Sequence, residues 1–257
     1  RGYTKLKDEI TREKPDSREQ LDYMPEYKAI PLAQIPQNQP WLRIQGPNQW
    51  PESIPDLKPT LLELQRQKVA LAKVLLTAFA ESLGQSPDVF AHTYSTNPSV
   101  LCKAIHYPGT AQAEQGVGAH KDGGYLTLLL QDEHSGLEVL KDDEWVPATP
   151  IKGTFIVNIG ELLEIASQGY LKATQHRVIT PPMNVDRYSL AFFLTSQLNA
   201  TVPLLELPAH LQPSNFAITQ DPKNPLFTEI GKNFLKGRLR SHPDVAVAHY
   251  SDLPQLA

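Results

Sequence analysis

Two histidines and one aspartate have the residue types and the spacing of a metal site. His120 and Asp122 lie two positions apart, just before an apolar run that begins at Tyr125. In an extended chain the side chains at i and i+2 point to the same face, so both could contact one ion while Lys121 points away. With the distant His176 they would form a facial triad, which favours Fe(II) and leaves coordination positions open. By itself this triplet is a weak signal, because such combinations are common by chance.

Arg187 and Ser189 form a second pair at i and i+2, in another strand-like run. The planar guanidinium binds a carboxylate through two parallel hydrogen bonds, and the hydroxyl would reach the same point. An arginine in an otherwise apolar strand needs an anion to offset its loss of hydration. The alternative is an arginine at a strand end that contacts solvent or Asp186, and without the metal triplet this alternative would be preferred.

Short strands are predicted around these residues. Their expected ranges are 100–107, 125–131, 137–140, 145–148, 155–159, 174–179 and 187–195. Glycine, proline and aspartate separate them, a spacing that indicates a sandwich or barrel rather than a βαβ sheet. A short helix is expected over 161–167, with the preceding Asn158 interpreted as part of a structural turn.

The flanking regions are rich in proline and predict few regular elements. Residues 1–58 are expected to form long ordered loops, followed by a helix over 59–83. The core-facing side of this helix is predicted from helical spacing; its members are Leu64, Leu71, Leu75, Ala78 and Phe79. Beyond residue 198 the chain again reads as loops, which often serve as lids or binding loops.

Composition excludes several classes of protein. The 257 residues are 40% hydrophobic and 20% charged, which is typical of a folded globular chain. A net charge of -4 argues against a nucleic-acid surface, and no apolar stretch approaches the ~20 residues of a membrane span. The single cysteine, Cys102, excludes an internal disulfide and a cysteine-rich zinc site. With no signal peptide visible, the expected compartment is the cytoplasm.

Taken together, the motifs resemble the Fe(II)/2-oxoglutarate-dependent oxygenases, in particular the isopenicillin-N-synthase-like branch. The similarity lies in His120-x-Asp122, His176 and Arg187-x-Ser189, and it extends to residues 14–19, 46–51, 158–161 and 187–193. It covers nearly the whole chain. The resemblance implies a mainly β fold with flanking helices around a double-stranded β-helix, or jelly-roll, core.

The resemblance also implies residue roles. The iron ligands would be His120, Asp122 and His176. The distal carboxylate of 2-oxoglutarate would be held by Arg187 and Ser189, with Tyr107 as a further hydrogen-bond donor. Lys103 and Ile105 share the face of Tyr107, which would turn into the barrel. Phe193 shares a strand face with Arg187 and is expected to line the substrate pocket, together with loops of residues 198–230.

The function expected from the resemblance is that of a dioxygenase. It would use Fe(II), O2 and 2-oxoglutarate to oxidise a small organic molecule, with hydroxylation as the default outcome. One oxygenase domain is expected over 1–257, with N-terminal loops and a helix (1–97), a jelly-roll core with the iron site (98–198) and a C-terminal part of loops and a helix that could form a lid (199–257). Relatives usually begin earlier, so the family's N-terminal segment is expected to be missing.

Two other functions stay open at this stage. Isopenicillin N synthase and aminocyclopropane-carboxylate oxidase share the Arg-x-Ser pair, yet they consume no 2-oxoglutarate and bind the carboxylate of the substrate instead. A non-catalytic jelly-roll binding module is the second alternative. The sequence names neither the substrate nor the oligomeric state.

Overall fold

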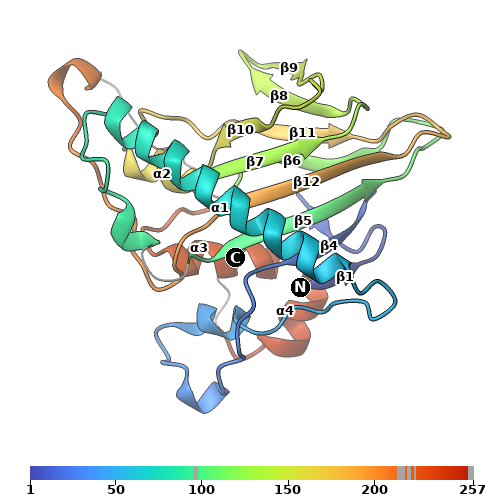
Figure 1. Ribbon diagram of the computed structural model, residues 1–257, viewed down its shortest axis with the longest axis horizontal. Coiled ribbons are helices and arrows are strands. Elements are labelled where there is room, and N and C mark those ends of the chain that lie inside the picture. Colours follow the sequence, from blue (N-terminus) through green and yellow to red (C-terminus); the bar gives the residue numbers. More distant parts are fainter. Residues whose placement is uncertain (95–97, 213–217, 219–220, 223, 254–257) are drawn as a thin grey trace.

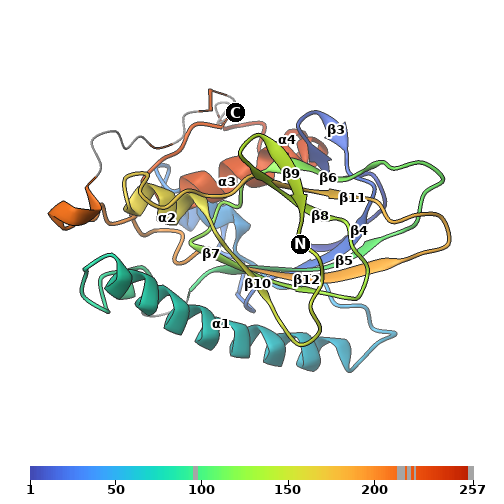
Figure 2. The ribbon, with the colours of Figure 1, turned by 90° about the horizontal axis from the view of Figure 1, so that it is seen from above.

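The computed structural model describes residues 1–94, 98–212, 218, 221–222 and 224–253, which form two large β-sheets, a two-stranded hairpin and four α-helices. The larger sheet has six strands in the order β1-β4-β5-β12-β7-β10. The smaller sheet has four strands in the order β6-β11-β8-β9 and faces the larger one (Figures 1 and 2). This arrangement confirms the predicted jelly roll with flanking helices.

The seven predicted strands are all present to within two residues at each end. The six-stranded sheet consists of β1 (Gly2–Thr4), β4 (Glu19–Tyr23), β5 (Val100–Tyr107), β12 (Arg187–Leu194), β7 (Leu126–Gln131) and β10 (Ile156–Ile159). The four-stranded sheet consists of β6 (Gln115–His120), β11 (His176–Ile179), β8 (Leu137–Lys141) and β9 (Glu144–Pro147), and β2 (Ile10–Thr11) pairs with β3 (Lys14–Pro15) in a hairpin. The helices are α1 (Leu57–Ser82), α2 (Glu161–Ala166), α3 (Ile230–Ser241) and α4 (Pro243–His249), with 3-10 turns η1 (Leu32–Gln34), η2 (Pro40–Ile44), η3 (Ala91–Thr93) and η4 (Ala209–Leu211).

Helix α1 covers the outer face of the six-stranded sheet, on the side opposite the four-stranded sheet (Figure 2). Its buried residues are Leu61, Gln65, Lys68, Ala72, Leu76 and Ala80. The predicted core-facing stripe is only partly confirmed: Leu75 and Phe79 pack against the core, whereas Leu71 is 38% exposed and Ala78 is exposed. The most deeply buried positions include alanines, which let the helix approach the sheet, and Lys68, whose ammonium reaches the carbonyl oxygen of Leu190 at 3.3 Å.

The N-terminal region is not all loop, contrary to the prediction for residues 1–58. Strand β4 pairs with β5 along its whole length, and β1 pairs with β4. The alternating pattern of β4 is polar on its inward side, where Gln20 and Asp22 are 3% and 1% exposed. A search for strands that turn apolar residues inward misses β4, because its inward residues are polar.

The position of His120 and Asp122 also differs from the prediction. They do not begin the strand at Tyr125: His120 is the last residue of β6, and Asp122 lies in the loop that crosses to β7 in the other sheet. Strand β6 was missed because it is rich in glycine. At Gly116 a Cβ atom would lie 3.0 Å from the ring of Tyr107, so a larger residue would disturb that side chain.

The C-terminal region contains two helices where loops and a single helix were expected. α3 packs against η2 and α4, and Figure 2 shows it beside the four-stranded sheet. Part of the predicted pocket loop, 198–230, lies outside the described residues. Among the described helices, none has the length and apolar character needed to cross a bilayer.

A histidine joins three segments at one end of the six-stranded sheet. The two ring nitrogens of His106 on β5 lie 2.8 Å from Glu19 Oε1 and 3.0 Å from Asp186 Oδ1, and the ring stacks on Tyr188. Burial acts to lower the pKa of His106, but the two carboxylates outweigh it and raise this pKa above 6.5. When the pH is below this pKa, the protonated ring joins β4 and the start of β12 to β5.

We expect His106→Gln to destabilise the protein more at pH 5.5 than at pH 8.5. The folded-state pKa is raised, so the stabilisation is fully present below the unfolded pKa of about 6.5 and disappears as the pH rises through the folded value. Thermal unfolding of both proteins at the two pH values measures this difference. A Glu19→Gln, Asp186→Asn double variant should lose the same pH dependence. Equal destabilisation by His106→Gln at both pH values would contradict the assignment.

Candidate metal centre and active-site cavity

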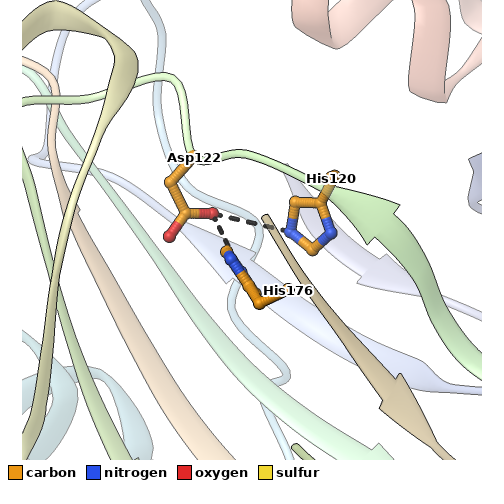
Figure 3. Close-up of side chains that lie close together, drawn as sticks. All are labelled: His120, Asp122 and His176. Atoms are coloured by element: carbon orange, nitrogen blue, oxygen red, sulfur yellow. Dashed lines mark ion pairs between the residues drawn. The ribbon is translucent and has the colours of Figure 1, made fainter. Parts of the chain in front are cut away.

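Three ligand atoms converge where the two sheets meet. The Nε2 atoms of His120 and His176 each lie 3.5 Å from the same oxygen, Oδ1 of Asp122, and the three side chains point toward one another (Figure 3). All three ligand atoms lie within 4.8 Å of one another. Ligand atoms that lie about 2.1 Å from a metal, at right angles to each other, are about 3 Å apart. The three side chains therefore need to move only slightly closer together to bind one ion.

Backbone carbonyl groups select the nitrogen that each imidazole presents to the metal. Nδ1 of His120 lies 2.8 Å from the carbonyl oxygen of Gly118, and Nδ1 of His176 lies 3.1 Å from that of Thr174. A carbonyl oxygen only accepts, so each Nδ1 carries the proton and donates it. Both Nε2 atoms are then left with a lone pair toward the metal position, as ligand histidines require.

The two oxygens of Asp122 have different partners. Oδ2 accepts hydrogen bonds from Thr127 Oγ1 at 2.6 Å and from Asn158 Nδ2 at 2.8 Å, and Oδ1 faces the two imidazoles. Thr127 and Asn158 are paired in register on β7 and β10. The two donors fix the rotation of the carboxylate, so that one oxygen alone is directed at the metal position.

The protonation states of the three side chains suit a cation. Burial would raise the pKa of Asp122, but His176, His120 and the Asn158 amide hold it well below its usual range. Burial lowers the pKa of His176. Burial also acts to lower the pKa of His120, but the neighbouring Asp122 outweighs it and raises this pKa.

The predicted arginine is fully buried and only partly paired. Arg187 is 0% exposed; its Nε donates to the carbonyl oxygen of His134 at 3.2 Å, and its Nη2 donates to Gln131 Oε1 at 2.6 Å. Its Nη1 has no hydrogen-bond partner among the described residues. The alternative contact with Asp186 is wrong, because that carboxylate binds His106 on the other face. A buried cation with a free donor fits a carboxylate.

One cavity contains all of these groups. It has an empty volume of about 610 Å³, including the part open to solvent, and lies between the inner faces of the two sheets. The predicted site residues that line it are His120, Asp122, His176, Arg187, Ser189, Tyr107 and Phe193. The guanidinium carbon of Arg187 lies 5.0 Å from the centre of the Tyr107 ring. No described residue of 198–230 lines this cavity, so that part of the pocket prediction is not supported.

Three residues of the cavity were missed by the sequence analysis. Asn158 was interpreted as a structural turn and Thr127 received no role, yet both hold Asp122. Arg18, which also lines the cavity, was assigned to a loop. The signal for Thr127 and Asn158 is a polar residue on the inward face of a strand. Which face is inward becomes known only when the strand pairing is known. Lys121 points away from the site, as predicted, and binds Glu164 at 3.0 Å.

Fold and site together define a class of protein. A jelly roll with two imidazoles and one carboxylate at the junction of its sheets has the ligand set of mononuclear non-haem iron oxygenases. Nitrogen and oxygen donors, with no thiolate, fit Fe(II) better than a thiophilic metal. The same cavity also contains the buried Arg187, whose Nη1 has no hydrogen-bond partner among the described residues.

Comparison with known proteins identifies the family. The sequence profile of the 2OG-Fe(II) oxygenase superfamily matches residues 96–196. A 2-oxoglutarate-dependent dioxygenase of Gibberella zeae is 31% identical over 283 positions, covering 100% of this chain and 73% of the relative. A homoarginine-6-hydroxylase of Arabidopsis thaliana is 34% identical and covers 80% of this chain and 63% of the relative. The chain therefore belongs to the 2OG-Fe(II) oxygenase superfamily.

Solved structures have the same fold. A putative 2OG-Fe(II) oxygenase family protein from Caulobacter crescentus matches with a TM-score of 0.70 and 28% identity, over 93% of this chain and 75% of that one. A Neurospora crassa structure in complex with alpha-KG and 5-formyluracil matches with a TM-score of 0.68 and 25% identity, over 93% of this chain and 71% of that one. The chain spans less than two thirds of the length of the homoarginine hydroxylases it matches.

We expect Asp122→Ala to abolish specific metal binding while the fold persists. The variant keeps two neutral imidazoles, so its affinity should fall by far more than the ~10–100-fold seen for residues that only support a ligand. Calorimetric titration with Mn(II) measures the affinity, and circular dichroism reports the fold. Asp88→Ala, which removes an exposed carboxylate that does not line the cavity, serves as the control. Unchanged Mn(II) affinity in Asp122→Ala would exclude this metal site.

Asn158→Ala should weaken Mn(II) binding by about 10–100-fold, because Asp122 then loses one of the two donors that fix its orientation. The same titration detects the change. Thr127→Val, which removes the other donor to the same oxygen, should shift the affinity in the same direction. An Asn158→Ala protein with wild-type Mn(II) affinity would show that the amide has only a structural role.

Proposed function

We propose that this protein is an oxidoreductase that couples O2 and the decarboxylation of 2-oxoglutarate to the oxidation of a small organic molecule, with hydroxylation as the default reaction. The observation that carries the proposal is the buried Arg187 in one cavity with the three metal-ligand side chains. Its free Nη1 donor needs an anionic partner. Structural relatives with alpha-KG in their complexes support the choice of that anion.

In this proposal His120, Asp122 and His176 hold Fe(II) on one side of the ion. Bound iron, with O2 and 2-oxoglutarate, supplies the oxidising chemistry. The protein contributes fixed ligand orientation through Gly118, Thr174 and Asn158, and it contributes the cavity that positions the reactants. These contributions come from backbone carbonyls and a buried amide, which do not change protonation during turnover.

Arg187 and Ser189 would hold the distal carboxylate of 2-oxoglutarate, and Tyr107 would lie beside it. Gly136 supports this position: its φ of +153° suits glycine, and a Cβ atom there would lie 3.3 Å from Cδ of Arg187. The guanidinium is thus confined between the β8 turn and the Tyr107 ring. A confined guanidinium loses little side-chain freedom when it binds a carboxylate.

The substrate would enter the remaining part of the cavity, where Phe193 is exposed to it on the inner face of β12. Several relatives are named homoarginine-6-hydroxylase, so L-homoarginine is the first compound to test. The proposal also includes one oxygenase domain over residues 1–257, with its jelly-roll core at 98–198 and a C-terminal lid within 199–257. Cytoplasmic localisation is also part of it, since the one cysteine is free and buried.

We expect Arg187→Ala to lower the affinity for 2-oxoglutarate at least ~10-fold. A charge-assisted pair of this kind contributes about 1.5–3 kcal/mol, and 1.4 kcal/mol corresponds to tenfold. Titration of the anaerobic Fe(II) protein with 2-oxoglutarate, followed by the visible charge-transfer band, measures the affinity. Arg187→Lys should recover only part of it, because a point charge does not reproduce the planar fork.

Arg177→Ala is the matched control, since this arginine on β11 pairs with Glu138 and lies over Trp145 outside the cavity. It should leave the band unchanged. Identical titrations of wild type and Arg187→Ala would show that Arg187 has another role. A wild-type protein that binds Fe(II) but gives neither band nor succinate would favour the oxidase chemistry that uses no 2-oxoglutarate.

A further inference from the structure

The turn between β7 and β8 connects the two large sheets and contacts the buried Arg187. It comprises residues 132–136, with β7 in the six-stranded sheet and β8 in the four-stranded one. Arg187 donates from Nη2 to Gln131 Oε1 at 2.6 Å and from Nε to the carbonyl oxygen of His134 at 3.2 Å. The two acceptors stand on either side of Asp132 in the sequence. The orientation of the guanidinium therefore depends on the conformation of the chain at Asp132.

The carboxylate of Asp132 fixes this conformation with two hydrogen bonds from the backbone. Oδ1 accepts the N–H of His134 at 3.0 Å, and Oδ2 accepts the N–H of Tyr188 at 2.6 Å. The first bond is an Asx-turn, in which aspartate binds its own backbone two residues on. The second bond reaches β12, at the residue directly after Arg187. One side chain thus holds both the acceptor of Arg187 Nε and the strand that carries Arg187.

The bond from Tyr188 takes the place of a rung in the sheet. β7 and β12 pair in register up to Gln131 with Ser189. The N–H of Asp132 continues the pairing and donates to the carbonyl oxygen of Tyr188 at 3.2 Å. The return bond ends on the Asp132 carboxylate, since a short polar side chain can substitute for a backbone acceptor. The backbone can therefore turn at Asp132 without leaving the N–H of Tyr188 unpaired.

Asp132 is held as an anion. Its side chain is 18% exposed, and burial acts to raise its pKa, but the backbone N–H groups of Tyr188 and His134 outweigh this and lower it. An ionised carboxylate accepts through both oxygens and donates through neither. Both backbone hydrogen bonds are therefore present at neutral pH.

The bonds to Gln131 and His134 leave the other edge of the guanidinium for a ligand. They use Nε and Nη2, whereas Nη1 has no hydrogen-bond partner among the described residues. A carboxylate can bind the edge formed by Nη1 and Nη2 through two parallel hydrogen bonds, because each of these nitrogens carries two hydrogens. Since the group is planar and rigid, the two protein acceptors also decide where Nη1 points.

From these contacts we infer that Asp132 is a positioning residue for the co-substrate: it holds the turn, and the turn holds Arg187 with its Nη1 edge presented to the distal carboxylate of 2-oxoglutarate. This inference rests on the proposed function. Asp132 is not among the residues that line the cavity, so it acts through Arg187. Its loss should therefore weaken recognition of the distal carboxylate and leave the metal site intact.

Asp132→Ala tests the inference through a comparison of two keto acids. The anaerobic Fe(II) protein is titrated with 2-oxoglutarate and with 2-oxopentanoate, which has the same five-carbon chain and keto-acid end but no distal carboxylate. We expect Asp132→Ala to lower the affinity for 2-oxoglutarate at least ~5-fold, the scale of one well-oriented hydrogen bond, with 2-oxopentanoate little changed. Asp132→Asn keeps one acceptor oxygen and should lose less. Mn(II) affinity should stay at the wild-type value in both variants.

Glu133→Gln is the matched control, since it removes an exposed carboxylate from the same turn. It should leave both affinities unchanged. A second test combines Asp132→Ala with Arg187→Ala. The double variant should bind 2-oxoglutarate no more weakly than Arg187→Ala alone, because the aspartate acts through the arginine. A purely structural aspartate would give equal losses for the two keto acids, or a further loss in the Arg187→Ala background, and either result overturns the inference.

The titrations of wild type and Arg187→Ala separate the two levels of the proposal. If Arg187→Ala weakens 2-oxoglutarate binding and Asp132→Ala does not, the positioning role is overturned and the oxygenase function stays in place. Absence of the charge-transfer band in wild type overturns the proposed function itself. If Asp132→Ala does not fold, Asp132→Asn carries the same comparison, and if 2-oxopentanoate binds no protein, the double variant decides.

Discussion

The buried carboxylate of Asp122 is the charge around which the core is arranged. It is 4% exposed, and an unpaired carboxylate in such a place would cost several kcal/mol or take up a proton. Its partners come from four different elements: Thr127 on β7, Asn158 on β10, His120 at the end of β6 and His176 on β11. The same contacts that make the charge tolerable therefore join the two sheets of the jelly roll. They also leave one oxygen and two imidazole nitrogens directed at one point.

A second buried charge, Arg187, defines the other end of the cavity. Gln131 and the carbonyl of His134 use two of its donor groups, and Gly136 and the Tyr107 ring restrict its movement. The two buried charges therefore differ: both oxygens of Asp122 have partners within the protein, whereas Nη1 of Arg187 has no hydrogen-bond partner among the described residues.

The two faces of the six-stranded sheet treat buried polar groups differently. On the outer face, beneath α1, Gln65 and Lys68 find partners on β5 and β12. On the inner face, the charged side chains of Arg18, Lys103 and Asp22 are held by ion pairs, while the amide of Gln20 has no hydrogen-bond partner among the described residues.

The sequence by itself predicted seven strands, α1 and α2, because period-two and helical patterns are local properties. The metal-ligand residues and the arginine–serine pair were predicted from their spacing together with the resemblance to a family, since the spacing alone is a weak signal. It did not determine β4 or β6, since the inward side of β4 is polar and β6 is rich in glycine. It placed Leu75 and Phe79 of α1 correctly against the core but also assigned the exposed Leu71 and Ala78 to it. Which residues hold Asp122 in place, and that Arg18 borders the cavity, were decided only by the tertiary structure. The physical reason is that strand pairing decides which polar side chain faces which charge. The pairs β4–β5, β7–β10 and β6–β11 join segments that are distant in sequence, so local patterns do not reveal these contacts.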